Sequence, residues 1–304
     1  MPKPRTILGL LAVLAGAMSA QARTDVAGNP VSVVVTVEGQ KGSAPPNVTR
    51  DDVMVSLDNQ RMHVTDWTPI LSDQKGLQLW VLIDDGTQTA VATQFDDLRK
   101  FVLEQSPTTE IGIGYIRNGS VQRAQPLTTD HVAAAKAIRL PLAQPGISAS
   151  PYLALVDDLL KKWPRGQQAR EVLMITSGID PDNGPGPINP YLDEAIDMAQ
   201  RAGVVVHSIY YASAGHFGHS QWQVYWGQNY LAKITDETGG EFFWIGNGSP
   251  VDFTPYLSEL NDHFHNQYVL TFVAQGKSGY ERLKLSTEVP HVSLVGPAKV
   301  YVGK

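Results

Sequence analysis

The chain contains no cysteine among its 304 residues, and this absence removes several functions at once. A disulfide framework, a cysteine-ligated metal, a thiol nucleophile and a lipid anchor on cysteine are all excluded. Three motifs of common enzyme classes are missing as well: the phosphate-binding loop G-x-x-x-x-G-K-[ST], the zinc motif H-E-x-x-H and the nucleophile elbow G-x-S-x-G. We therefore expect a protein that is not an enzyme.

Clusters of positive charge are scarce. Lys and Arg number 24 against 30 Asp and Glu, so the formal net charge is −6, and the longest basic run outside the N-terminal segment is Lys161-Lys162. Nucleic acids and anionic membrane surfaces bind proteins through clustered positive charge. Neither is an expected partner of this chain.

Long hydrophobic runs are confined to the N-terminus. Residues 1–22 (MPKPRTILGLLAVLAGAMSAQA) combine a basic start, an apolar stretch over 7–18 and a small-x-small end at 20–22. This pattern predicts a secretory signal peptide cut after Ala22, and therefore a soluble protein exported to the periplasm or the medium. A membrane anchor is the alternative, but the apolar stretch is shorter than the ~20 residues that span a bilayer.

Short strands mark both ends of the remaining chain. Between residues 31 and 70 apolar and polar residues alternate, as in VMVSLD (53–58), and the same period of two returns after Asn266. We expect an N-terminal β segment (23–72) and a C-terminal β segment (267–304). The latter should pair with residues 31–70 in a small β-sandwich-like unit.

The central part, residues 73–266, alternates strands with helices. The segments LQLWVLI (77–83) and EVLMIT (171–176) are apolar almost throughout, which indicates strands covered on both faces. This pattern predicts an α/β fold with a doubly wound, mostly parallel sheet. Ligands of such sheets bind beyond the carboxyl ends of the strands, where DDGTQT (84–89) should lie.

The order of these elements resembles the von Willebrand factor type A domain, and residues 31–304 as a whole resemble the exported bacterial "VWFA-related" proteins. The stretches that carry the resemblance are NVTRDDVMVSLDNQ, LWVLIDDGTQTAVATQFDDLRKFV, HFGHSQWQVYWGQNYLAKITDETGGEFF and NQYVLTF. The resemblance implies a protein-binding module with a metal-ion-dependent adhesion site. In that family the site combines D-x-S-x-S after the first strand, a Thr from a second loop and an Asp after the fourth strand.

The first loop matches this site in chemistry. The residues that supply D-x-T-x-T are Asp85, Thr87 and Thr89. A register that starts at Asp84 is the alternative, and it puts Gly86 and Gln88 at the hydroxyl positions. We prefer the register of Asp85, because glycine has no side-chain oxygen, and Asp84 then adds negative charge nearby.

The second and third loops match less well. Ser148 or Ser150 stands in for the Thr, and Ser177 replaces the expected Asp, although Asp180 or Asp182 is within reach in the same loop. The loss of a carboxylate weakens cation binding, so the degenerate site holds Mg²⁺, Mn²⁺ or Ca²⁺ weakly, or holds no metal. In the alternative interpretation, DDGTQT only caps the following helix through Asp or Thr oxygens.

One long connection, residues 212–228, is rich in aromatic side chains and follows the fifth strand of the α/β part. The candidate partner-binding residues in it are His216, His219, Trp222 and Trp226. Exposed aromatic residues at the rim of a ligand site are good anchors for a protein partner. Two alternatives stay open: the tryptophans cover the core, or the two histidines form half of a metal site whose third ligand is not evident.

The sequence therefore predicts an exported, non-enzymatic module that binds a protein or peptide, with an acidic side chain of the partner as a possible ligand of the metal. The binding crevice would be formed by residues 84–89, 146–150, 177–182 and the aromatic connection. The main alternative is a structural component of a cell-envelope assembly that binds neither metal nor ligand. A hydrolase that uses one of the loop serines is a third hypothesis.

Overall fold

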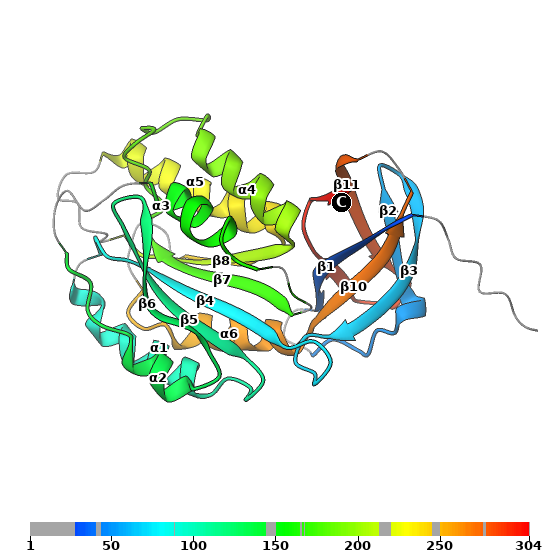
Figure 1. Ribbon diagram of the computed structural model, residues 1–304, viewed down its shortest axis with the longest axis horizontal. Coiled ribbons are helices and arrows are strands. Elements are labelled where there is room, and N and C mark those ends of the chain that lie inside the picture. Colours follow the sequence, from blue (N-terminus) through cyan, green and yellow to red (C-terminus); the bar gives the residue numbers. More distant parts are fainter. Residues whose placement is uncertain are drawn as a thin grey trace, which may run out of the picture.

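The computed structural model describes residues 28–303 apart from 41–43, 88, 144–149, 165, 167, 213–219, 245–249 and 276–277. The predicted signal peptide, Ser148, His216 and His219 lie outside the described residues. The chain forms an α/β domain and a β unit, which lie side by side in Figure 1.

The α/β domain is built on a six-stranded sheet. Its strands are β4 (Leu77–Asp84), β5 (Glu110–Arg117), β6 (Ser120–Thr128), β7 (Ala169–Thr176), β8 (Val204–Tyr210) and β9 (Phe242–Phe243). The order in the sheet is β6-β5-β4-β7-β8-β9, and all neighbours are parallel except β5 and β6. This is the strand order of a doubly wound fold, so the predicted fold class is confirmed.

Helices cover both faces of this sheet. They are α1 (Phe95–Leu103), preceded by the 3-10 helix η2 (Thr89–Gln94), then α2 (His131–Lys136), α3 (Pro151–Ala154), the π-helix η3 (Leu155–Leu160), α4 (Pro190–Ala202), α5 (Gln221–Thr238) and α6 (Thr254–His265). One core contains residues of α1, α2 and α6, and the other contains residues of α3, η3, α4 and α5. Strand β4 contributes Leu79 and Val81 to the first core and Trp80 and Leu82 to the second, which explains its apolar sequence.

Helix α5 begins earlier than the sequence suggested. The sequence predicted a connection over residues 212–228, but the structure has a helix from Gln221, after a capping box in which Ser220 accepts from the amide of Gln223. Trp222 and Trp226 therefore lie on a helix rather than on a loop.

The β unit is a single seven-stranded antiparallel sheet. Its strands are β1 (Asn29–Glu38), β2 (Val53–Leu57), β3 (Gln60–Pro69), β10 (Gln267–Ala274), β11 (Gly279–Thr287), β12 (Ser293–Val295) and β13 (Lys299–Val302), with the 3-10 turn η1 (Arg50–Asp52) before β2. The order is β12-β1-β10-β3-β2-β11-β13, so C-terminal β10 lies between N-terminal β1 and β3.

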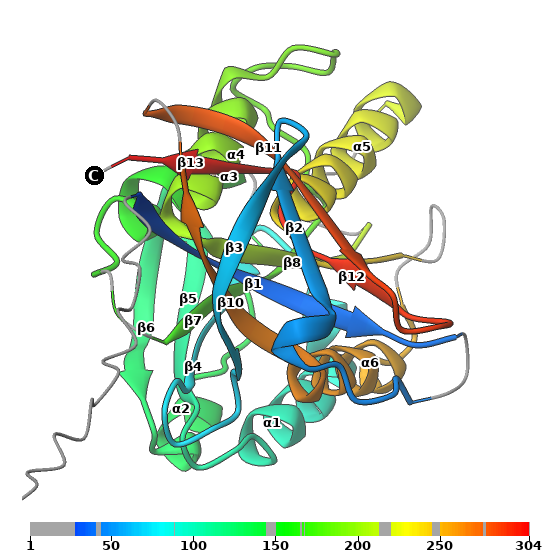
Figure 2. The ribbon, with the colours of Figure 1, turned by 90° about the vertical axis from the view of Figure 1, so that its right-hand side faces the viewer.

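The two chain ends thus form one unit, as predicted, but not the two packed layers of a sandwich. The sheet curls around its own core, which includes Val35, Val55, Phe272 and Val300 (Figure 2). Curling buries the apolar face of alternating strands without a second sheet.

The β unit packs against the amino ends of the parallel strands. A methyl group added to Gly203, just before β8, would lie 3.4 Å from the carbonyl oxygen of Ser32 in β1. Val34 of β1 and Val269 of β10 join the α/β core. The carboxyl ends of the parallel strands are consequently at the far end of the domain from the β unit (Figure 1).

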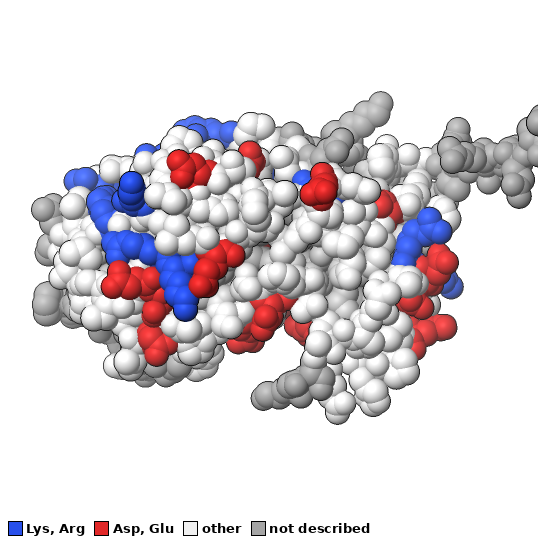
Figure 3. Space-filling model, turned by 90° about the horizontal axis from the view of Figure 1, so that it is seen from below, with Lys and Arg blue, Asp and Glu red and all other residues white. Residues whose placement is uncertain are grey.

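Surface charge is mixed on the face shown in Figure 3. Lys and Arg side chains gather on the left of this view, with Asp and Glu side chains next to them. Local ion pairs such as Arg99 to Asp96 (2.8 Å) in α1 are typical of this surface.

Candidate functional site

The carboxyl ends of β4 and β7 meet through Asp84. One carboxylate oxygen, Oδ2, accepts a hydrogen bond from the hydroxyl of Thr176 at 2.8 Å, and Oδ1 accepts from the amide of Gly86 at 2.9 Å. Burial raises the pKa of the Asp84 carboxyl, and the nearby charge of Asp85 adds a smaller increase. Thr176, the last residue of β7, was not among the residues predicted from the sequence.

Asp85 faces away from this pair. Its two carboxylate oxygens accept from the guanidinium of Arg139 at 2.7 and 3.0 Å, and Oδ1 also accepts from the amide of Leu142 at 3.0 Å. Successive residues at a strand end point to opposite sides, so Asp84 and Asp85 serve different loops. Asp85, which the sequence placed first among the metal ligands, is instead the fully buried partner of an arginine.

Arg139 also contacts Tyr115. Its guanidinium carbon lies 3.8 Å from the ring centroid of Tyr115, and the Tyr115 hydroxyl donates to the Arg139 carbonyl at 2.7 Å. The hydrogen bond with the Asp85 carboxylate raises the pKa of Arg139. Burial raises the pKa of the Tyr115 hydroxyl to about 12. The three side chains fix the segment after α2 onto the ends of β4 and β5.

In the described structure, neither threonine of DDGTQT makes a hydrogen bond to a carboxylate. Thr87 is fully buried and its hydroxyl has no hydrogen-bond partner among the described residues, while Thr89 is exposed at the start of η2. Helix α1 begins only at Phe95, and its N-cap makes no side-chain bond. The alternative interpretation, in which Asp85 or Thr87 caps that helix, is therefore wrong.

The second and third loops do meet. The Ser150 hydroxyl donates to Asp180 Oδ2 at 2.8 Å, and the Ser150 amide donates to Asp182 at 2.9 Å. Asp180 Oδ2 also accepts from the side-chain amides of Asn183 and Asn189, both at 2.9 Å. The protein's own donors thus occupy the Asp180 carboxylate. Ser177, also buried, accepts a weak bond from the amide of Ile179 at 3.4 Å.

The described donor set does not fit the predicted adhesion-type metal site. Mg²⁺ requires about six oxygens converging on one point. Here Asp84 faces Thr176, Asp85 faces Arg139 and Asp180 faces Ser150 with two asparagines. Among the described residues, none of the three acids belongs to a group of three or more His, Asp or Glu side chains whose ligand atoms all lie within 4.8 Å of one another.

The aromatic residues of α5 form a fixed cluster beside these loops. Trp222 and Tyr225 are 56% and 52% exposed and stack at 5.9 Å, and Trp226 packs edge-on against both at 5.7 and 5.6 Å. Trp226 continues the contact inward to Tyr230 at 5.7 Å. The inner rings cover the core, as one alternative held, but Trp222 and Tyr225 do not.

Two glycines, Gly178 and Gly227, allow α5 to pack closely against the loop that follows β7. A methyl group on Gly227 would lie 2.6 Å from the carbonyl oxygen of Ser177, and one on Gly178, whose φ is +68°, would lie 2.4 Å from the carbonyl oxygen of Gly227. The Tyr230 hydroxyl accepts from the amide of Gly186 at 3.0 Å. The aromatic cluster therefore stands at the carboxyl end of the sheet.

A second group of polar side chains lies at the opposite end of the α/β domain. Glu38, Glu241 and His263 each offer a ligand atom, and these atoms lie within 4.8 Å of one another. It is the one such group of three found among the described residues. No sequence motif marks this group, because Glu38 and Glu241 are more than 200 residues apart and Glu241 and His263 more than 20.

No family model and no curated protein matches the chain. Similar solved structures include an aerotolerance-related membrane protein from Bacteroides fragilis, with 13% identity, a TM-score of 0.45, and 62% of this chain and 98% of that chain covered. The conserved hypothetical protein BatB from Bacteroides thetaiotaomicron has 13% identity, a TM-score of 0.44, and coverage of 62% and 97%.

A von Willebrand factor type A protein from Catenulispora acidiphila is also similar, with 10% identity, a TM-score of 0.46, and 90% of this chain and 73% of that chain covered. This structure is named for the domain that the sequence resembles. Within the described part of the chain, none of the helices has the length and apolar character needed to span a bilayer.

Proposed function

We propose that this chain is an exported, non-enzymatic module that binds a protein or peptide at the carboxyl-end rim of its parallel sheet. The observation that carries the proposal is the pair Trp222 and Tyr225, more than half exposed on α5 and stacked at 5.9 Å. Exposed large aromatic side chains are frequent binding anchors, and this rim is where doubly wound sheets take their ligands.

The cluster is organised before any partner arrives. Trp226 and Tyr230 support the two exposed rings from below, and Tyr152 contacts Tyr230 edge-on at 6.0 Å. Side chains that are already ordered lose little conformational entropy on binding, so more of the contact energy appears as affinity. Such a surface favours an apolar or aromatic segment of a partner.

The described acids of the rim face separate partners rather than one common point. Arg139 supplies a fixed positive charge at Asp85, where the resemblance placed a metal ion. A guanidinium that makes two hydrogen bonds to a carboxylate satisfies it without a cation. We therefore propose that the partner binds to the aromatic cluster of α5. Contact between an acidic partner side chain and a bound Mg²⁺ stays a prediction, and the arrangement of the described carboxylates does not favour it.

The described serines give a hydrolase no support. Ser150 donates to Asp180, and Ser177 accepts only a backbone amide, so neither is hydrogen-bonded to a described histidine. Nucleophilic serines are activated by an adjacent base.

A peptide-library selection on the immobilised chain tests the binding proposal. We expect enriched peptides to bind the Trp222→Ala and Tyr225→Ala variants at least tenfold more weakly than the parent chain. Tyr280→Ala is the matched control, because Tyr280 is 40% exposed and also packs on a neighbouring ring, but on the β unit. Peptides that bind all three variants alike, or no enrichment, would contradict the proposal.

Light scattering distinguishes the recognition module from the main alternative, a structural component of an envelope assembly. A structural component of an envelope assembly should self-associate or form stoichiometric complexes that survive Trp222→Ala. A recognition module should stay monomeric and lose its partner with that substitution.

A further inference from the structure

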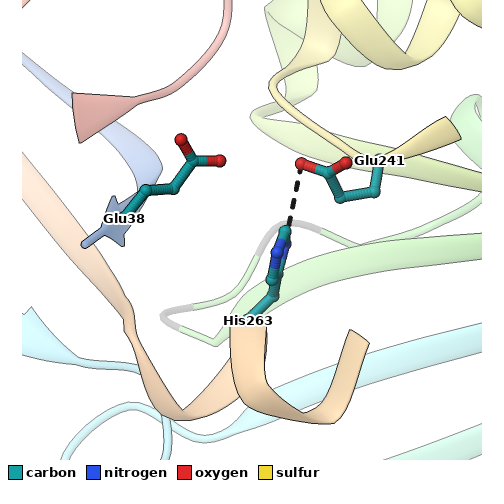
Figure 4. Close-up of side chains that lie close together, drawn as sticks. All are labelled: Glu38, Glu241 and His263. Atoms are coloured by element: carbon teal, nitrogen blue, oxygen red, sulfur yellow. Dashed lines mark ion pairs between the residues drawn. The ribbon is translucent and has the colours of Figure 1, made fainter. Parts of the chain in front are cut away.

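Three side chains from three separate segments converge where the β unit meets the α/β domain. Glu38 ends β1 of the β unit, Glu241 precedes β9, and His263 lies in the last turn of α6. Figure 4 shows the His263 ring directed at the Glu241 carboxylate, with the Glu38 carboxylate facing the same space. His263 Nδ1 lies 3.8 Å from Glu241 Oε1, which is too long for a direct hydrogen bond.

Negative charge predominates at this junction. Of the ion pairs among described residues, the one that reaches Glu241 comes from His263, and none reaches Glu38. Burial, more than any neighbour, lowers the pKa of His263 and raises the pKa of Glu241.

The residues behind the cluster add to the same imbalance. His207, fully buried, donates from Nε2 to Glu171 Oε2 at 2.7 Å, and its Nδ1 accepts from the amide of Glu241 at 2.9 Å. The other carboxylate oxygen of Glu171 is buried without a hydrogen-bond partner among the described residues. The same imidazole also holds the backbone of Glu241 in place.

The donor atoms suit a borderline metal rather than a hard one. Imidazole nitrogen and carboxylate oxygen are both ligand types of Zn²⁺, and where three protein groups bind this ion a water takes the fourth position. Metal-to-ligand bonds of about 2.0–2.2 Å in a tetrahedron separate the ligands by roughly 3.4 Å. The 3.8 Å between Nδ1 of His263 and Oε1 of Glu241 is close to that separation.

One carboxylate oxygen of Glu38 can bind an ion. The hydroxyl of Ser293 donates to Glu38 Oε2 at 3.1 Å, and Oε1 has no recorded bond in the described structure. All three side chains are only partly buried, so an ion can enter from solvent.

We propose that Glu38, Glu241 and His263 form a zinc site that ties the β unit to the α/β domain. Because Glu38 belongs to one body and the other two ligands to the second, the bound ion links them. A ligand that binds only the folded arrangement stabilises it by mass action. This site is separate from the aromatic cluster of α5, which lies at the other end of the α/β domain.

Calorimetric titration of the full chain, without a polyhistidine tag, with Zn²⁺ tests this proposal. We expect one bound ion per chain and a rise in Tm on saturation. Glu38→Gln, Glu241→Gln and His263→Asn should each weaken binding at least tenfold. His265→Asn is the matched control, because His265 lies in the same helical turn but bonds to the Asn261 carbonyl, and it should bind as the parent does.

Co²⁺ gives a spectroscopic readout that does not depend on stability. The parent chain should show the visible absorption of four-coordinate Co²⁺, and Zn²⁺ should abolish it. The conservative Glu38→Gln variant should be folded by circular dichroism and lack the band. Absence of stoichiometric binding, or equal binding by parent and Glu38→Gln, would overturn the proposal.

Discussion

Arg139 and Asp85 form a two-point ion pair across 54 residues of chain, with nitrogen-to-oxygen distances of 2.7 and 3.0 Å. The carboxylate is fully buried, whereas 41% of the arginine side chain is exposed. The pair closes the rim at the position where the resemblance to von Willebrand factor type A domains implied a metal ion. Several consequences of this arrangement can be measured.

Removal of the arginine should destabilise the chain. Arg139→Gln leaves the buried Asp85 charge without its partner, and loss of one member of a buried pair costs about 3–5 kcal/mol. Because Arg139 is partly exposed, we expect about 2 kcal/mol in urea denaturation. The double variant with Asp85→Asn should recover part of the loss. A change below about 0.5 kcal/mol in the single variant would show that the pair is not important for stability.

Divalent cations should not bind at the rim. Mg²⁺ and Mn²⁺ titrated into the chain are expected to give no heat that depends on Asp85, because Arg139 already occupies both oxygens of this carboxylate. Asp85→Ala supplies the comparison. A binding signal that the parent shows and Asp85→Ala lacks would restore the metal site predicted from the sequence.

Asp84 should make stability fall as pH rises. Its folded-state pKa is raised above the ordinary 3.8, so between 3.8 and the folded value the folded state holds a proton that the unfolded state has lost. Unfolding then releases a proton, and the free energy of unfolding decreases with increasing pH across this window. Asp84→Asn removes the effect. In urea melts the variant should be more stable than the parent at pH 7, with the difference shrinking toward pH 4.

Equal pH profiles of the two proteins would contradict this assignment. The amide can keep both contacts, because its oxygen accepts from Gly86 and its nitrogen can donate to Thr176.

The seating of α5 should be sensitive to a single methyl group. In Gly227→Ala the added carbon would meet the Ser177 carbonyl at 2.6 Å, and overpacking of this kind costs about 1–3 kcal/mol. The helix propensity of alanine offsets about 1 kcal/mol of this cost. We expect lower stability and weaker binding of the selected peptides.

Gly186→Ala is the control for that experiment. Gly186 lies in the same loop region, has no atom within 4 Å of the added position and has no positive φ. Its substitution should change thermal stability by less than about 0.5 kcal/mol. Similar losses in both variants would mean that the glycine contact is unimportant.

Much of the fold could be predicted because burial repeats locally along each element. The apolar run from Leu77 to Ile83 indicated a central strand, and β4 does lie between β5 and β7 with cores on both sides. Helix α4 ends at Gly203, whose φ of +65° suits glycine. The early start of α5 was missed although Ser220 and Gln223 form the S-x-x-Q pattern of a capping box.

The candidate site was less predictable, because a motif does not say which way its side chains point. The sequence identified the loops, and Ser150 and Asp180 do meet at 2.8 Å. It did not indicate that Asp85 would turn to Arg139, or that Thr176 would approach Asp84. Neither partner is marked by a spacing or a motif.

The sequence by itself determined the order of the strands and helices, the pairing of the two chain ends and the place of the polar loops, because these follow from hydrophobic periods within short windows. Only the tertiary structure decided which charges meet. Asp85 finds Arg139, and Glu38 approaches Glu241 and His263, through contacts between distant segments. Electrostatic interactions depend on separation in space and on burial, and neither is encoded in the local pattern of residues.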